Sequence, residues 1–266
     1  MNKVNPLYYV PAEVPEDCII RLSPSSIGTF TERPWQWYRQ NVLGLDTFEY
    51  NTSSVIGTVV HYCAEQVATG KAVDKEAINS YINSFTDKED YSTSTVHNEW
   101  YPVAHTLIND YTLGRTVLDA EMQVCKSLGD GVYVAGTCDL IEGTKEDALL
   151  TDYKTYNSKI APKSFNFGYK LQLLTYALIL REQGINVTRI RNVYINRPVD
   201  GGISEKTGKP LKSYPPAVTV LTHVITDEDL VYVKSMLDLW KDTYLTGLKH
   251  PELLHIIYHD PRLKEI

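Results

Sequence analysis

The sequence has 266 residues and a formal net charge of −7, and 43% of its residues are hydrophobic. This length fits one large domain or two small ones with a buried core. The longest apolar run, LLTYALIL at 173–180, is too short to cross a bilayer, and the N-terminus has prolines and acids where a signal peptide is apolar. The acidic charge argues against a general nucleic-acid coat protein, because phosphate binding depends on Lys and Arg. We therefore expect a cytoplasmic protein without a membrane partner.

The first half of the chain is predicted to be mainly helical. Residues 1–20 read as an extended, proline-bearing arm, and LSPSSIGTF supplies a helix start with Ser23 as N-cap and Pro24 at the first helical position. A second helix covers PWQWYRQNV and ends near Gly44, and a third covers SSVIGTVVHYCAEQVATG and stops at Gly70. Two further helices are expected at 74–85 and 96–113.

The pattern changes near Gly114. Three β-rich runs, TVLDAEMQVCKSL, GVYVAGTCDLIEG and DALLTDYKT, are separated by GDG and GTKED, which predicts an antiparallel meander. A helix at 164–183, a strand VTRIRNVYINRP, a mobile surface loop at 197–216, a strand at 217–225 and a helix from Asp227 follow. The prediction is an α/β (α+β) fold in one domain, 1–266, with a mainly helical N-terminal lobe at 1–113 and a sheet core with the C-terminal helix at 114–266.

Two aspartates and a lysine stand inside the β-rich runs. Asp139 closes the second run, Asp152 interrupts the third, and Lys154 lies two residues later. Because the turn between the runs is short and a strand has a period of two, both carboxylates and the lysine can meet on one face. A hard divalent cation that also binds phosphate oxygens would offset the cost of burying the acids. For a lone D-x-K, however, the more frequent structure is a salt bridge on a solvent-facing strand.

Four further motifs occur in order around this pair. They are S-x-S-x-h-x-x-F in LSPSSIGTF, G-x-x-x-H in GTVVH, G-x-x-D in GTCDL and, after DYKT, Q-x-x-x-Y in LQLLTY. Together the motifs over residues 22–176 resemble the RecB-like branch of the PD-(D/E)XK nuclease superfamily, which includes CRISPR-associated adaptation nucleases and phage exonucleases. The resemblance implies a restriction-endonuclease-like core with a central mixed sheet flanked by helices.

The resemblance also implies a metal site. Asp139 and Asp152 would ligate Mg²⁺ or Mn²⁺, with the backbone carbonyl of Tyr153 as a further ligand, and Lys154 would be catalytic. His61 would be another ligand, although a His on an apolar helix face is by itself more often a core residue. Glu121, one strand before Asp139, would either complete the site or face outward as an ordinary strand residue.

The other candidate site residues lie outside the metal centre. Gln172 and Tyr176, one helical turn apart, would support the scissile phosphate. Ser25 and Ser26 are expected to serve the capping and packing of the first helix before anything else, with DNA contact, which the resemblance implies for this segment, as the alternative. The basic and aromatic side chains of RPWQWYRQ could bind single-stranded nucleic acid, with the aromatic rings stacked on its nucleotides. The alternative is that these aromatic rings are buried in the core. The residues proposed to contact nucleic acid are Ser25, Ser26, Arg33, Trp37, Lys159, Lys163 and Lys170, and Trp35, Tyr38 and Arg39 belong to the same segment as Trp37. A solvated loop is the default for Lys206, Lys209 and Lys212.

One feature departs from many RecB-like relatives. The four cysteines, Cys18, Cys63, Cys125 and Cys138, form no C-x-x-C pair and none follows position 138. Arg33 precedes Pro34 where relatives have a Cys-Pro. We therefore expect free thiols and no iron–sulfur cluster.

The function implied is a metal-dependent deoxyribonuclease, an exonuclease that hydrolyses phosphodiester bonds from DNA ends through a metal-activated water. Phage DNA recombination, replication or repair in a bacterial host cytoplasm would suit it, with a single-strand annealing or recombination protein as candidate partner. The alternatives are a structure-specific endonuclease and an inactive DNA-binding or assembly module of the same fold. The oligomeric state is open.

Overall fold

The computed structural model describes residues 5–8, 10–41, 43–45, 50–86, 88–204 and 206–250, with the side chain of Trp35 outside the described part. The elements in the first half are β1 (Ile20–Leu22), η1 (Pro24–Ser26), α1 (Ile27–Glu32), α2 (Pro34–Asn41), α3 (Thr52–Ala68), α4 (Lys75–Asn83), α5 (Thr93–Leu107) and the π-helical turn η2 (Ile108–Thr112). Those in the second half are β2 (Val117–Gly129), β3 (Val132–Gly143), β4 (Ala148–Tyr156), α6 (Phe167–Glu182), β5 (Val187–Asn196), β6 (Val218–Val224) and α7 (Asp227–Lys249).

The strands form one mixed sheet in the order β1-β3-β4-β5-β6, with β2 on the other edge of β3. The β2–β3, β3–β4 and β5–β6 pairs are antiparallel, and the β1–β3 and β4–β5 pairs are parallel. The predicted meander and the predicted mixed sheet are therefore confirmed. Strand β3 shares one edge between two partners: β1 pairs with residues 132–134 and β4 with residues 140–143. This arrangement leaves residues 135–139 of that edge without a strand partner among the described residues.

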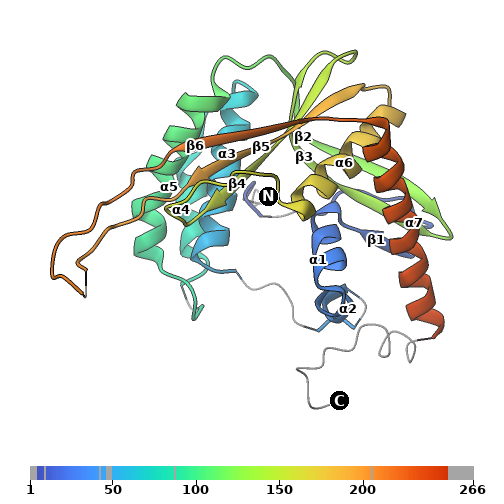
Figure 1. Cartoon of the computed structure of the whole chain (residues 1–266), viewed down its shortest axis with the longest axis horizontal. Coiled ribbons are helices and arrows are strands. Elements are labelled where there is room, and N and C mark those ends of the chain that lie inside the picture. The colour runs from blue at the N-terminus through green and yellow to red at the C-terminus, as the bar shows by residue number, and fades with distance from the viewer. Residues whose placement is uncertain are drawn as a thin grey trace.

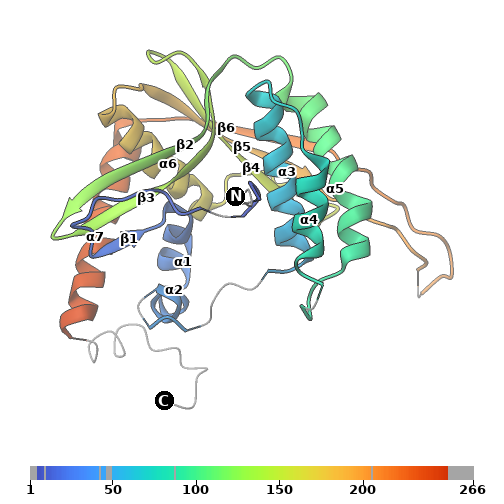
Figure 2. The same cartoon turned by 180° about the vertical axis from the view of Figure 1, so that it is seen from behind.

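Helices cover both faces of the sheet (Figure 1). One face packs on α6, α7, α1 and α2 through a core that includes Trp37, Leu174 and Trp240. The other packs on α3, α4 and α5 through a core that includes Val59, Leu107 and Val193. The view from behind shows the same two helical groups on either side of the strands (Figure 2). The prediction that the whole chain forms one domain stays a prediction.

Helix boundaries follow local capping chemistry. Asn51 and Ser54 form a reciprocal capping box at α3, and Asn166 accepts from the Tyr169 N–H at the start of α6. Ser23 takes the N-cap position before η1 but makes no side-chain capping hydrogen bond. Its hydroxyl instead lies 2.9 Å from that of Ser25. Ser23 thus occupies the expected N-cap position, but its side chain does not cap the helix.

Three differences from the sequence-based elements stand out. Strand β1 lies within a segment expected to be an arm and then a helix start, because its pairing depends on β3, far along the chain. The helix expected at 96–113 ends at Leu107 and continues as η2, whose wider turn directs Tyr111 into the core. The segment 197–216 is not an irregular loop, because Val199 bridges Tyr214 and Ile203 bridges Pro210.

None of the helices in the described part of the chain combines the length and the apolar character that a bilayer crossing requires.

Candidate active site

The site begins where β3 and β4 separate. Their ladder ends at the pair Leu140 and Thr151, so Asp139 and Asp152 come directly after the last pairing. The Tyr153 N–H then donates to Asp139 Oδ2 at 2.8 Å. A side-chain carboxylate therefore replaces the backbone carbonyl that would have continued the ladder, and the chain positions both acids at one point, as the sequence predicted.

Asp152 is a buried carboxylate with three donors. Lys154 Nζ donates to Oδ1 at 2.9 Å, Asn192 Nδ2 donates to Oδ2 at 2.8 Å, and Gln172 Nε2 lies 3.4 Å from Oδ1. Burial raises the pKa of Asp152, the Lys154 ammonium opposes this, and the charge of Asp139 raises it further. The donors thus hold in place a carboxylate that desolvation disfavours.

Lys154 lies between these acids and the α6 layer. Burial alone would lower the pKa of Lys154, but the carboxylates of Asp152 and Asp139 outweigh it and keep the pKa above its usual value. The ammonium also lies 4.6 Å from the centre of the Tyr169 ring. In this arrangement Lys154 is a cation, which suits it to hold a negatively charged group or a water molecule.

His61 reaches the site from α3. Its Nδ1 lies 3.3 Å from Asp139 Oδ2, and its ring packs edge-on against Tyr153. Close packing of α3 on β4 makes this possible, because a Cβ on Gly57 would lie only 3.1 Å from Thr155 Oγ1. The glycine of GTVVH therefore packs on the threonine of DYKT, and the histidine follows one helical turn later.

Gln172 and Tyr176 line the site from α6. Gln172 Oε1 lies 3.5 Å from Lys154 Nζ. Tyr176 packs against Gly136, where a Cβ would come within 2.5 Å of the tyrosine Oη. Burial raises the pKa of Tyr176 well above its usual value, so its hydroxyl stays protonated. Both side chains thus meet the β3 and β4 motifs, as predicted.

A cavity of about 650 Å³ opens at this point. The predicted site residues on its wall are Ser25, His61, Glu121, Asp139, Gln172 and Tyr176. Glu121 has a left-handed backbone (φ 53°) and borders the cavity with its side chain accessible from it. The protein atoms around Glu121 nevertheless desolvate its carboxyl, and this effect, followed by the charges of Asp139 and Glu65, raises its pKa to about 9. Glu121 thus borders the cavity, and its role as an acid that completes the metal site stays a prediction.

The donor types suit a hard divalent cation: His61 lies beside Asp139, Asp152 follows the same ladder end on β4, and Tyr153 adds a backbone carbonyl. After burial, the charge of Asp139 also raises the pKa of Asp152, and a divalent cation held by these carboxylates would offset that repulsion. Within the described residues, no three His, Cys, Asp or Glu side chains already converge as a metal cluster. The present hydrogen bonds of Asp152 go to Lys154, Gln172 and Asn192 instead.

Asn192 was missed by the sequence analysis. It is fully buried on β5, directly beside Asp152 in the parallel register. Its only sequence signal is a polar residue before the apolar run VYI, and this gives no hint of a partner forty residues earlier. The amide fixes Oδ2 of Asp152 while Lys154 holds Oδ1.

Several predicted nucleic-acid contacts take other roles. Trp37 is fully buried against Phe30 and Trp240, so the stacking expected of it is wrong. Lys170 forms an ion pair with Asp229 of α7 at 2.9 Å and joins two helices instead of standing free. Ser26 Oγ donates to the Ser23 carbonyl, which is a local turn contact.

The remaining contacts stay predictions. Arg33, Lys159 and Lys163 are exposed, and Ser25 borders the cavity. Trp35, from the same segment as Trp37, has its side chain outside the described residues.

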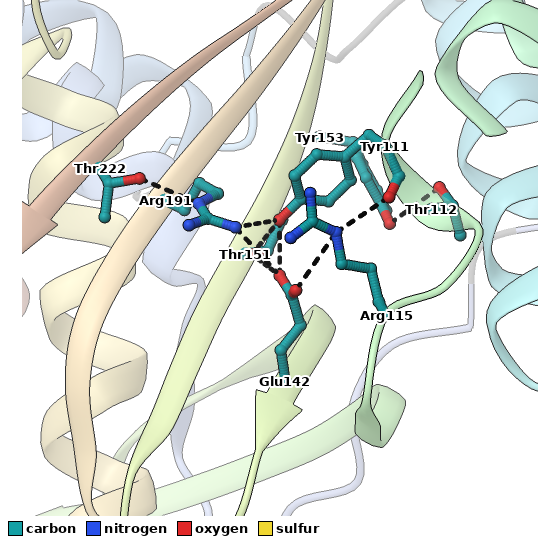
Figure 3. Close-up of polar contacts among 8 residues, drawn as sticks. All are labelled: Tyr111, Thr112, Arg115, Glu142, Thr151, Tyr153, Arg191 and Thr222. Atoms are coloured by element: carbon teal, nitrogen blue, oxygen red, sulfur yellow. Dashed lines mark hydrogen bonds and ion pairs between the residues drawn. The ribbon is translucent and has the colours of Figure 1, made fainter. Parts of the chain in front are cut away.

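A buried polar network lies on the opposite face of β4 (Figure 3). Glu142 accepts hydrogen bonds from Tyr111 Oη and Thr151 Oγ1, each at 2.5 Å. Arg115 and Arg191 lie 3.7 and 3.8 Å from its carboxylate, and Arg191 also donates to Tyr111 Oη at 2.9 Å. This network fastens η2 to β3, β4 and β5.

The comparisons with known proteins agree with this fold. The profile of the PD-(D/E)XK nuclease superfamily matches residues 21–237, and the chain belongs to this superfamily. An ATP-dependent helicase/deoxyribonuclease chain, found in three Streptococcus agalactiae strains, is 26% identical over 180 residues, covering 61% of this chain but 16% of the relative. The chain therefore corresponds to a small part of that protein's length.

A solved structure shows the same fold. The crystal structure of a "putative exonuclease" from Eubacterium rectale matches with a TM-score of 0.52 and 14% identity, over 85% of this chain and 80% of that one. A phage related exonuclease from Haemophilus somnus 129PT is 12% identical, with a TM-score of 0.40, over 86% of this chain and 96% of that one.

Proposed function

We propose that the chain is a metal-dependent deoxyribonuclease that acts as an exonuclease on DNA ends. The observation that carries the proposal is the convergence of Asp139, Asp152 and Lys154 where β3 and β4 separate, with His61 beside Asp139. Superfamily membership supports nuclease chemistry. A cavity of about 650 Å³ beside these residues is of the size that holds a small molecule, which suits the terminal nucleotide of a strand.

Asp139, Asp152 and His61, with the Tyr153 carbonyl, would hold Mg²⁺ or Mn²⁺. A cation bound there would supply Lewis-acid charge to the phosphate and lower the pKa of water. A role in recombination, replication or repair, together with a recombination protein as partner, stays a prediction.

The chain's own side chains account for the rest of the chemistry. In hydrolysis, water oxygen bonds to phosphorus, the P–O ester bond breaks, and the leaving oxygen takes up a proton. Lys154, held as a cation by Asp152, would donate hydrogen bonds to the phosphate or the attacking water and offset the growing negative charge. Gln172 would orient the ammonium, and the neutral Tyr176 hydroxyl would donate to a phosphate oxygen.

The test compares wild type with Lys154→Ala on labelled linear DNA, single- and double-stranded, beside a covalently closed circle, in Mg²⁺, Mn²⁺ or EDTA. Lys145→Ala is the matched control, because Lys145 is exposed in the turn before the same strand. We expect metal-dependent loss of linear DNA only, a rate reduced about 10²- to 10⁴-fold in Lys154→Ala, and full activity in the control.

Cutting of the closed circle would replace the exonuclease by an endonuclease. Equal activity in all three proteins would refute the assigned site. DNA binding without cleavage under any condition would make the binding module the better account.

A further inference from the structure

Residues 197–204 and 206–216, called the arm below, form a paired hairpin that projects from the molecule beyond α5 (Figure 1). Val199 and Tyr214 exchange backbone hydrogen bonds, both at 2.9 Å, and the Leu211 N–H donates to the Gly202 carbonyl at 2.9 Å. The two chains lie so close that a Cβ on Gly201 would collide with the Leu211 carbonyl oxygen. The arm is therefore held in shape by its own backbone, with glycine required at the closest approach.

The root of the arm is fixed to three elements of the core. Arg197 is 7% exposed, and its Nε donates to Glu99 of α5 at 2.6 Å while Nη1 donates to Ser53 of α3 at 2.7 Å. Its N–H donates to the Tyr156 carbonyl at the end of β4. A buried, hydrogen-bonded ion pair at the root sets the direction in which the arm leaves the sheet.

The arm carries positive charge on a protein that is otherwise acidic. Residues 197–216 contain four basic and two acidic residues, whereas the chain has a net charge of −7. Lys206, Lys209 and Lys212 are exposed, and Lys159, on the segment after β4, joins them: its ammonium lies 5.9 Å and that of Lys212 5.3 Å from the centre of the Tyr214 ring. The exposed Asp200 is turned to the arm's own backbone, since its carboxylate accepts from the Gly202 N–H.

These lysines contribute little to folding. Within the described part of the chain, the ion pairs formed by lysines involve Lys126, Lys154, Lys170 and Lys241, and none involves Lys159 or the three lysines of the arm. Exposed ammonium groups beside an aromatic ring form the combination that binds the backbone and bases of nucleic acid strands.

The arm also starts near the candidate active site. Tyr194 of β5 pairs with Lys154 of β4, and the arm begins three residues after Tyr194. At the strand rise of about 3.3 Å per residue, the root lies about 10 Å further along the strand. Lys159 comes five residues after Lys154, just beyond the end of β4. Lys159, the root of the arm and the active site therefore lie at the same end of β4 and β5.

We propose that the arm, with Lys159, binds the sugar–phosphate backbone of the DNA strand whose end enters the cavity. This inference rests on the proposed nuclease function, because it names where the substrate is held. The lysines would contact phosphates and Tyr214 would support a base or sugar. This DNA contact by the arm and Lys159, called the clamp below, would attract DNA to one surface of an acidic protein. It would also keep the strand beside the active site after each cleavage.

The test uses the full chain with Lys159, Lys206, Lys209 and Lys212 all changed to Ala, called the arm variant. The control changes four exposed lysines elsewhere, Lys71, Lys75, Lys88 and Lys145, to Ala, so that net charge falls equally. Fluorescence anisotropy measures the Kd for a long labelled oligonucleotide in EDTA over a range of NaCl concentrations, so no turnover is needed. Thermal unfolding midpoints are recorded alongside.

We expect the arm variant to bind at least about tenfold more weakly, with a salt slope of log K smaller by about 3, as the loss of four phosphate contacts to a single strand predicts. The control variant should bind as wild type does, and the unfolding midpoints should agree. Unchanged binding in the arm variant, or an equal loss in the control, would overturn the proposal. A lowered midpoint only in the arm variant would also count against it, since the arm lysines would then stabilise the fold.

The two proposals fail in different ways. If wild type binds DNA through the arm but cleaves nothing in any metal, the nuclease function fails and the clamp stands. If wild type cleaves DNA and the arm variant binds it as tightly, the clamp fails and the nuclease function stands. Preferential binding of a polyglutamate peptide over DNA by the arm would overturn the clamp in favour of an acidic protein partner.

Discussion

The most informative perturbation of the fold is Glu142→Ala in the buried network of Figure 3. The carboxylate is 7% exposed and lies 3.7 Å from Arg115 Nε and 3.8 Å from Arg191 Nη1. It also accepts from Tyr111 and Thr151, at 2.5 Å each. Its removal leaves two guanidinium groups without their counter-charge and a tyrosine hydroxyl without its acceptor.

Breaking a buried ion pair by removing one partner costs about 3–5 kcal/mol. Here the Arg191 side chain is 16% exposed, but that of Arg115 is 36% exposed, so solvent screens part of the loss at Arg115. We therefore expect a loss at the lower end, about 3 kcal/mol of unfolding free energy. For a chain of this size that corresponds to about 6–12 °C in Tm.

Urea unfolding followed by far-UV circular dichroism measures the change, with Glu146→Ala as control. Glu146 is exposed in the turn between the same two strands and should change stability by less than about 0.5 kcal/mol. A loss below about 1 kcal/mol for Glu142→Ala would mean that the guanidinium groups are stable without the carboxylate, and would refute the argument from buried charge.

Three further outcomes are expected. Asn192→Ala should lower kcat about tenfold on linear DNA while the Kd measured in EDTA stays the same, because the amide positions a buried carboxylate of the site; a change in Kd alone would contradict this. Gly136→Ala should cost about 1–3 kcal/mol in urea unfolding by pressing on the Tyr176 hydroxyl, and Tyr176→Phe in the same chain should recover part of that loss. Partial burial would raise the pKa of Asp229, but hydrogen bonds from Lys170 and other donors outweigh it and hold this pKa below its usual value. The ionised Asp229 therefore stabilises the folded state above about pH 4, and this contribution to the unfolding free energy is lost as the pH falls. Between pH 7 and pH 3, Tm should therefore drop less in Asp229→Asn than in wild type.

The sequence predicted the parts of the site that depend on local spacing. The D-x-K pattern places Asp152 and Lys154 on one face of a strand whatever surrounds it, and Gln172 and Tyr176 share a helix face for the same reason. The sequence did not predict the role of Asn192, because its contact with Asp152 depends on the parallel register of β4 and β5. A crossover that contains α6 determines this register. Periodicity along one strand carries no information about its neighbour in the sheet.

The wrong stacking role of Trp37 has a similar origin. Alternating aromatic and basic residues fit a nucleic-acid surface and an amphipathic helix equally well. What decides is a partner that the local pattern does not contain: Trp240 of α7 lies 6.0 Å from Trp37 between ring centres and encloses it. The hairpin of the arm was not predicted for the same reason. Its Gly- and Pro-rich sequence suggests a mobile loop, and only the pairing of Val199 with Tyr214 shows the hairpin.

Tyr153 connects the active site to the buried network on the other face of the sheet. Its N–H binds Asp139, and its ring packs against His61 and Tyr111. Its hydroxyl lies 3.4 Å from that of Thr112 in η2. Because the backbone of this strand residue holds a site acid while its side chain contacts η2, any shift of η2 away from the sheet would move Tyr153 and with it the hydrogen-bonded Asp139. The polar network around Glu142, which holds η2 against the sheet, therefore also supports the position of Tyr153 and, through its N–H, that of Asp139.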